Sequence, residues 1–283
     1  MVRKKLFLFT AVGALAVGLL IGCSSGESNS NGVREIKVAF DQGLNPIAYI
    51  DDKGNPTGYE IEAMKLVDQE LKDYKFKYVG TTSDDLLIGV EQGKFQVGVK
   101  NAFFTEERTK KFLYPKEFLG LSSTGLVVKK ENKEVNTLEE FAKKGLSLAP
   151  IAANSAQYTL IENYNTKHPD NKVKLKAGDT FSLDIVQWVN EERVDGGVMI
   201  EGPFNEQVTN PKGAYHNLKN DIFYNEFTVI QTWPLFNKKE QAFAEAYDKA
   251  IKKVKEEGKL RELSKKFYSR DLFEVQDQSQ KKS

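Results

Sequence analysis

The stretch from residue 35 to residue 99 decides the fold. It opens with EIKVAFD (35–41), whose apolar side chains alternate as in a strand, and continues with GYEIEAMKLVDQEL (58–71), whose apolar side chains recur at helical spacing. KFKY (75–78) alternates again, a helix is expected from Ser83, and FQVGV (95–99) reads as a third strand. This order predicts a βαβαβ unit, the building block of an open parallel sheet.

A second set of elements repeats this order between about residues 130 and 225. A capping box at Thr137–Glu140 predicts a helix that ends at Gly145. Strands are then expected at Leu146–Leu148, Val173–Leu175 and Val194–Ile200, and helices at Asn154–Tyr164 and Ser182–Glu191. An extended segment (Phe227–Leu235), a helix from Phe243 that Gly258 ends, a last helix through Leu260 and Phe267, and a loose polar tail from Gln276 complete the prediction.

Two similar units predict two Rossmann-like α/β lobes with a ligand cleft between them. The connections near Ser123–Val128 and Val229–Leu235 both look extended and would form a two-strand hinge. We therefore expect residues 33–126 to form the first part of lobe 1, residues 127–230 lobe 2, residues 231–275 the rest of lobe 1, and residues 276–283 the tail. Two rigidly fused domains are the alternative.

The N-terminus carries a targeting signal. Arg3, Lys4 and Lys5 precede a charge-free stretch, residues 6–21, which is too short to span a bilayer and is typical of a secretory signal. It ends in LIGCSS (20–25), which resembles the bacterial lipobox. The resemblance implies that residues 1–22 are a signal peptide, that Cys23 is diacylated, and that the small, polar residues 23–32 form a tether. A plain secretory signal with a chance cysteine, or an uncleaved anchor, is the alternative.

Composition excludes several classes of protein. The 283 residues carry 41 basic and 40 acidic side chains, so no overall field attracts nucleic acid. Loss of 22 residues would leave 261, and loss of their three basic side chains would change the net charge from +1 to −2. One cysteine and two histidines exclude an intramolecular disulfide framework and leave little for a zinc site, so we expect no metal and no cofactor.

In open α/β sheets the ligand lies beyond the carboxyl ends of the strands. Taking the residues at those ends, with their neighbours, gives the candidate ligand-binding set: Asp41, Ser83, Lys100, Asn101, Phe103, Thr105, Arg108, Asn154, Ser155 and Glu201. The set holds cations, carboxylates and neutral polar groups, which together are complementary to a zwitterion. Arg108 can bind a carboxylate in bidentate fashion, and Glu201 can accept from an ammonium group.

The chain resembles a substrate-binding lipoprotein of a polar amino acid ABC importer, in the periplasmic-binding family with the type II fold. The matching segments are GNPTGYEIE (54–62), TEER (105–108), RVD (193–195) before Glu201, and GKL (258–260) with FY (267–268). The resemblance implies that Arg108 clamps the ligand α-carboxylate, that Asn154 and Ser155 form the ligand-binding turn, and that Glu201 stands for the aspartate that binds the α-ammonium. It also places Asp41 at an acidic pocket position.

Departures from the family pattern bear on the ligand. Leu44 and Ser83 occupy the positions of two aromatic residues that often sandwich the ligand side chain, Lys100 replaces a serine, and Ala153 replaces the glycine of the turn. Asn101 together with TEER resembles members that bind cystine or similar sulfur amino acids. Without the resemblance, residues 105–108 also fit a capped, solvated helix start, and Glu201 a surface acid.

The sequence therefore predicts a monomeric, lipid-anchored solute receptor on the outer face of the bacterial cell membrane. It would bind an amino acid, deliver it to an ABC permease and its ATPase, and do no chemistry on it. GxGxxG, P-loop and HExxH motifs are absent. GxSxG is absent from residues 27–283, and its one match, at residues 22–26, belongs to the lipobox-like segment. A cell-surface hydrolase, such as a glycosidase with two generic carboxylates, and a sensory ligand-binding module on the same fold are the alternatives.

Overall fold

The computed structural model describes residues 32–153, 155–178 and 184–282. Its strands are β1 (Arg34–Asp41), β2 (Gly43–Leu44), β3 (Ala48–Ile50), β4 (Pro56–Thr57), β5 (Tyr74–Thr81), β6 (Val97–Ala102), β7 (Gly120–Lys129), β8 (Ile151–Ala152), β9 (Ala177–Gly178), β10 (Gly196–Ile200) and β11 (Ile222–Phe236). Its α-helices are α1 (Tyr59–Glu70), α2 (Ser83–Glu91), α3 (Glu106–Thr109), α4 (Leu138–Lys143), α5 (Ala156–Lys167), α6 (Ile185–Asn190), α7 (Glu201–Phe204), α8 (Gln241–Glu256), α9 (Lys259–Tyr268) and α10 (Leu272–Lys282). Short 3₁₀ turns η1 (Lys130–Asn132) and η3 (His216–Leu218) and a π-helical turn η2 (Asn205–Thr209) complete the elements.

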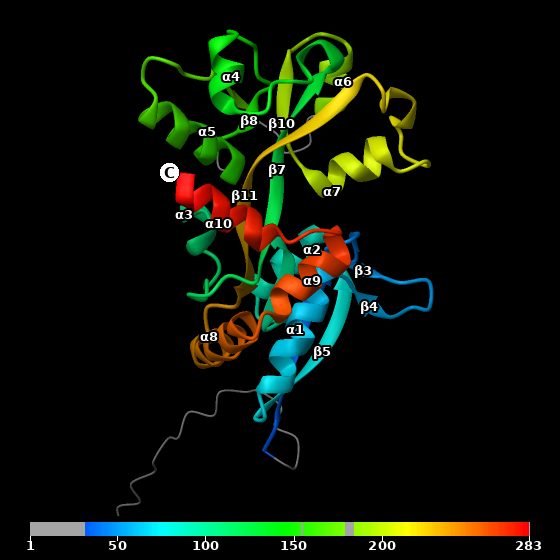
Figure 1. Cartoon of the computed structure of the whole chain (residues 1–283). Coiled ribbons are helices and arrows are strands. Elements are labelled where there is room, and N and C mark those ends of the chain that lie inside the picture. Colours follow the sequence, from blue (N-terminus) through cyan, green and yellow to red (C-terminus); the bar gives the residue numbers. More distant parts are fainter. Residues whose placement is uncertain (1–31, 154, 179–183, 283) are drawn as a thin grey trace, which may run out of the picture.

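The first βαβαβ unit is confirmed. β1 pairs in parallel with β5 along its whole length and with β6 over residues 38–40. These strands belong to a six-stranded sheet in the order β10-β7-β11-β6-β1-β5. β7 and β11 are its long antiparallel members, and they run through both halves of the molecule (Figure 1). One continuous sheet therefore joins the two lobes.

The two lobes have separate hydrophobic cores. In lobe 1, α1 and α8 cover the sheet, and Phe243, Tyr247 and Ile251 of α8 are fully buried at the helical spacing read from the sequence. In lobe 2, α4 contributes Phe141 to one core, and α6 contributes Val186 to a second core on the other face. The two-lobed α/β architecture expected from the sequence is confirmed.

The change from one lobe core to the other falls within β7 and β11. On β7, Leu121 packs in the lobe 1 core and Leu126 in a lobe 2 core, and residues 122–125 between them are Ser-Ser-Thr-Gly. On β11, Phe227 packs against the lobe 2 core and Val229 against that of lobe 1. A shift in the β7–β11 register lies between Glu226 and Thr228, at this same boundary. Small polar residues and a bulge thus occupy the crossover between the lobes.

The second βαβαβ unit is less regular than the sequence predicts. The strands expected at Leu146–Leu148 and Val173–Leu175 are reduced to isolated bridges, and the paired strands β8 and β9 lie a few residues later. Pro150, which has no N–H to donate, separates the first of these segments from β8. The strand at Val194–Ile200 is present as β10, which pairs with β7.

Helix starts agree with the sequence in some places and differ in others. Thr137 caps α4 with Glu140 in the predicted capping box. For α2 the cap is Thr82, whose hydroxyl accepts from the backbone N–H of Asp85, so Ser83 is instead the first helical residue. The helix expected from Ser182 is α6, which starts at Ile185 after Asp184 as its cap.

The C-terminal segment also differs from the expected loose tail. α9 begins after Gly258 and ends at Tyr268, and the next residue, Ser269, adopts a left-handed φ of 58°. The chain then forms α10, which includes Gln276 and packs against α9, β7 and β11. Its apolar residues Leu272 and Phe273 are buried in the lobe 1 core, and this burial explains why a polar sequence is helical here.

The predicted signal peptide, Cys23 and nearly all of the tether lie outside the described residues. Within the described ranges, no helix is both long and apolar enough to cross a membrane.

Candidate ligand-binding site

A cavity of about 530 Å³ lies between the two lobes. It collects seven of the residues predicted from the strand ends: Asp41, Ser83, Lys100, Asn101, Phe103, Arg108 and Ser155. Lobe 1 supplies the first six, and lobe 2 supplies Ser155. The rest of the lining comes from residues 43–45, Ile47 and Ala102 in lobe 1, and from Ile200, Gly202, Pro203, Glu206, Gln207 and the first residues of α5 in lobe 2.

Arg108 is held in place by its own neighbourhood. Thr105 caps α3 by accepting from the backbone N–H of Arg108 (3.2 Å). The guanidinium Nη1 donates to the carbonyl oxygen of Phe103 (2.9 Å), which also accepts from the hydroxyl of Tyr114 (2.8 Å). Arg108 thus lines the cavity with part of its fork engaged by the protein. Thr105 is not among the lining residues and acts by fixing the start of α3.

Lys100 and Arg108 bring two cations to the lobe 1 side. Burial lowers the pKa of Lys100, and the nearby Arg108 guanidinium lowers it further, whereas the Asp41 carboxylate works in the opposite direction. An anionic group in the cavity would relieve the repulsion between the two cations. This side is therefore suited to a carboxylate ligand.

Ser155 is buried, and its hydroxyl has a structural task. It caps α5 by accepting from the backbone N–H of Tyr158 (3.1 Å). Ala156 and Gln157, in the first turn of this 12-residue helix, also line the cavity. The helix N-terminus favours negative charge at this point. Asn154, the predicted partner of Ser155, lies outside the described residues.

Glu201 does not line this cavity. Its carboxylate Oε2 accepts from Arg270 Nη2 at 2.7 Å, and the residue faces an adjoining cavity of about 200 Å³. The two cavities share Ile47, Ile200 and Gly202 in their walls. The pairing with Arg270 arises from tertiary structure, because 69 residues separate the partners.

Glu206 is a carboxylate that sequence reasoning missed. It lines the main cavity from lobe 2, in the turn after α7, and its Oε1 accepts from the side chain of Asn210 (3.0 Å). It lies six residues beyond the end of β10, in the π-helical turn η2, and no local motif marks it as TEER marks Arg108. Leu44, taken from the family pattern as a replaced aromatic, does line the cavity.

The arrangement combines Arg108 and Lys100 with the carboxylates of Asp41 and Glu206 in one inter-lobe cavity. Such a set can bind a molecule that carries both an anionic and a cationic group, because each buried charge on either partner then finds its opposite. In the described part of the chain, no cluster of three or more His, Cys, Asp or Glu side chains is placed to hold a metal ion.

Comparison with known proteins gives a consistent result. The family of bacterial extracellular solute-binding proteins, family 3, matches residues 36–270. The L-cystine-binding protein TcyJ of Bacillus subtilis is 31% identical over 278 residues, which cover 96% of this chain and 98% of the relative.

Solved structures show the same fold. The probable amino-acid ABC transporter extracellular-binding protein YtmK of Bacillus subtilis has a TM-score of 0.63 at 22% identity, covering 83% of this chain and 97% of that one. The L-cystine solute receptor of Neisseria gonorrhoeae, in its unliganded open conformation, has a TM-score of 0.56 at 19% identity, covering 84% and 94%. Two lobes around a charged cavity and a family match across nearly the whole body lead to one conclusion: the chain belongs to the bacterial extracellular solute-binding proteins of family 3.

Proposed function

We propose that this protein is the extracytoplasmic solute receptor of an ABC importer and that it binds a zwitterionic amino acid by closing its two lobes. The observation that carries the proposal is the inter-lobe cavity in which Arg108 and Lys100 meet Asp41 and Glu206. A zwitterion satisfies groups of both signs at once. Because the lining comes from both lobes, a bound ligand would favour the closed arrangement.

Each end of the ligand has candidate partners. Arg108 would take the α-carboxylate with its planar fork, assisted by the N-terminus of α5 from the opposite lobe. Asp41 and Glu206 face the cavity and can accept from an ammonium group. The family pattern assigns Glu201 to the α-ammonium, and this role stays a prediction. Glu201 would serve a ligand that extends into the adjoining cavity, which it lines.

L-Cystine is our first candidate ligand. It carries two zwitterionic ends, and the cavity offers two cations, two carboxylates and the apolar side chains of Leu44 and Ile47. The relative TcyJ, whose name states that it binds L-cystine, matches this chain over 96% of its length. The absence of a stacking aromatic at positions 44 and 83 is compatible with a flexible disulfide side chain.

The remaining parts of the proposal concern delivery. The closed receptor would dock on the membrane permease, whose ATPase drives transport, and the ligand would leave chemically unchanged. The protein would act as a monomer, tethered through a diacylglyceryl group on Cys23. These points rest on the family membership and on the lipobox-like sequence LIGCSS.

Calorimetric titration with a graded panel tests the function. The panel contains L-cystine, L-cystathionine, L-cysteine, L-arginine, L-glutamine and glutathione. We expect L-cystine to bind most tightly, and L-cystathionine to bind more weakly because it lacks the disulfide. At about 100 times its dissociation constant the best ligand should raise the free energy of unfolding by about 2.7 kcal/mol.

Two outcomes would contradict the proposal. No binding by any zwitterion would exclude the receptor function for amino acids. Hydrolysis of a panel compound during the titration, seen by mass spectrometry, would favour the hydrolase alternative.

A further inference from the structure

Arg270 connects the two lobes. Its neighbours Tyr268 and Leu272 pack in the lobe 1 core, whereas its guanidinium reaches lobe 2. Nη2 donates to Oε2 of Glu201, the first residue of α7, at 2.7 Å. Nη1 donates to Oε1 of Glu226 on β11 at 3.1 Å. One lobe 1 side chain thus binds two carboxylates that belong to the lobe 2 end of the sheet.

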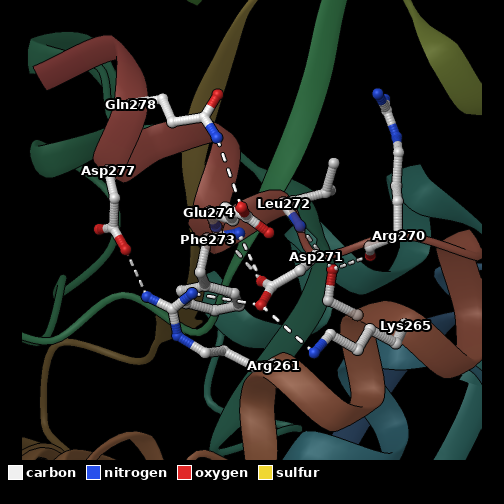
Figure 2. Close-up of polar contacts among 10 residues, drawn as sticks. Arg261, Lys265, Arg270, Asp271, Leu272, Phe273, Glu274, Asp277 and Gln278 are labelled. Atoms are coloured by element: carbon white, nitrogen blue, oxygen red, sulfur yellow. Dashed lines mark hydrogen bonds and ion pairs between the residues drawn. The ribbon is translucent and has the colours of Figure 1, made fainter.

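The backbone around Arg270 is fixed to α9. The hydroxyl of Ser264, which is fully buried, donates to the carbonyl oxygen of Arg270 (2.8 Å) and accepts from the N–H of Leu272 (2.9 Å). Asp271 caps α10 by accepting from the N–H of Phe273 (3.0 Å) and pairs with Arg261 (3.2 Å). Figure 2 shows these contacts clustered between α9 and the start of α10, with the Arg270 side chain extending away from them. Arg270 is therefore a cation on a rigid base.

The lobe 2 end of this contact lies at the crossover between the lobes. Glu226 is the last residue before the register shift of β11. Its carboxylate also accepts from the hydroxyl of Ser123, which lies 2.9 Å from the hydroxyl of Tyr224. A rotation of lobe 2 about residues 122–125 and 226–228 would move Glu201 relative to Arg270, whereas Glu226, near the axis, would move less.

Burial makes these contacts stronger than ordinary surface pairs. The side chains of Arg270, Glu201 and Glu226 are 34%, 29% and 21% exposed. Partial desolvation strengthens a charge-assisted hydrogen bond, and a guanidinium that serves two carboxylates is held more firmly than an isolated pair. The Nε atom of Arg270 is buried and has no hydrogen-bond partner among the described residues. The guanidinium is thus placed for the two carboxylates and not for its own lobe.

We propose that Arg270 is an inter-lobe tether that sets the angle between the lobes through its ion pair with Glu201. The tether lies beside the main cavity, since the adjoining cavity that contains Glu201 shares three wall residues with it. Arg270 is a positioning residue: it does not line the cavity but controls how the two sets of lining residues face one another.

The test measures the distance between the lobes by pulsed electron paramagnetic resonance, without any ligand. Spin labels are attached to Lys53→Cys, at the exposed turn between β3 and β4, and to Lys212→Cys, in the exposed turn after η2, in a Cys23→Ala background. We expect Arg270→Gln to broaden the distance distribution and displace its mean. Raising NaCl from about 0.05 M to about 0.5 M should shift the parent in the same direction, because salt screens partly exposed pairs, and should change Arg270→Gln much less.

Arg261→Gln is the matched control. Arg261 pairs with Asp271 and Asp277 within its own C-terminal segment, so its removal loosens that segment without touching lobe 2. The proposal is wrong if Arg270→Gln keeps the parent distribution, or if Arg261→Gln changes it equally. If Arg270→Gln does not fold, the same distance measurement is made on Glu201→Gln, in which Glu226 still neutralises Arg270. A distribution equal to that of the parent would then contradict the proposal. The outcome is independent of the proposed function, because no ligand enters the measurement.

Discussion

The backbone N–H of Asn101 donates a hydrogen bond to the carboxylate of Glu60, with 3.0 Å between N and Oε2. Glu60 is 1% exposed and belongs to the GYEIE segment of α1. Asn101 adopts a left-handed φ of 55°, and its side-chain Nδ2 donates to Ser122 Oγ on β7 at 3.2 Å. A buried carboxylate thus joins the family motif, the cavity wall and the crossover between the lobes.

Glu60 should make stability depend on pH. Burial raises its pKa from 4.5 to about 7, although the hydrogen bond from Asn101 and the charge of Lys100 oppose the rise. The folded state then holds a proton that the unfolded state has lost. The free energy of unfolding therefore falls as pH rises from about 4.5 to about 7, by on the order of 3 kcal/mol.

Glu60→Gln should remove most of this slope. Urea denaturation of the parent and the variant at a series of pH values from 4 to 8 measures it. Glu62→Gln, on the same helix but with its side chain reaching solvent, should keep the parent slope. Equal slopes for the parent and Glu60→Gln would contradict the assignment.

Arg108→Ala should weaken ligand binding. Loss of a charge-assisted bidentate contact costs about 1.5–3 kcal/mol, which corresponds to roughly a tenfold to a hundredfold rise in Kd. Calorimetry with the best ligand of the panel measures it. Arg108→Lys keeps the positive charge but not the planar guanidinium, so its Kd should lie between that of the parent and that of Arg108→Ala. Unchanged affinity in Arg108→Ala would exclude Arg108 as the carboxylate clamp.

Lys100→Met should stabilise the fold and weaken binding at the same time. Burial and the neighbouring Arg108 lower the pKa of Lys100, so its charged form is unfavourable in the folded protein. This cost is present at neutral pH and disappears as pH rises from the lowered pKa toward 10.5. We expect a higher Tm for Lys100→Met at pH 7, and a higher Kd for the best ligand of the panel because the ligand carboxylate loses one cationic partner. A lower Tm together with an unchanged Kd would show that Lys100 only supports the fold.

Gly58→Ala should be far more destabilising than Gly54→Ala, although both glycines belong to the same motif. Both have positive φ, 114° and 83°. A Cβ at Gly58 would lie 2.5 Å from the carbonyl oxygen of Ile47, a cavity residue, whereas one at Gly54 would meet nothing within 4 Å. We expect costs of about 3 kcal/mol and about 1–2 kcal/mol, measured by urea denaturation. Similar costs would mean that backbone conformation alone matters at Gly58.

Cys23→Ala should abolish membrane attachment without affecting ligand binding. The cysteine is the proposed lipidation site and precedes the described residues by a polar tether. Fractionation of cells that express the parent or the variant, with mass spectrometry of the N-terminus, measures attachment. Ser24→Ala, the adjacent residue, is the matched control and should stay on the membrane. A variant retained as fully as the parent would refute the anchor.

The local pattern of apolar residues is sufficient to predict many of the helices and strands of this protein. The alternation of Ile36, Val38 and Phe40 and the helical spacing of Phe243, Tyr247 and Ile251 follow from periods of two and 3.6 residues, so these elements and their buried faces were readable in advance. Strand ends also meet at one edge of a parallel sheet, so Asp41 and Lys100 are expected together from the sequence, and the TEER motif that follows β6 adds Arg108. Such inferences need only short-range geometry.

Other features depended on contacts between distant segments. Glu201 was predicted to face the ligand cavity, but Arg270 is 69 residues away in sequence and takes its carboxylate. Glu206 lines the cavity because a π-helical turn follows α7, and the polar residues after Leu272 are helical because their apolar neighbours are buried against lobe 1. Sequence by itself determined the family, the two α/β lobes and most of the polar side chains that lobe 1 contributes to the cavity. Only tertiary structure decided which charges are free for a ligand, because ion pairs form between side chains that folding brings together and that no local period connects.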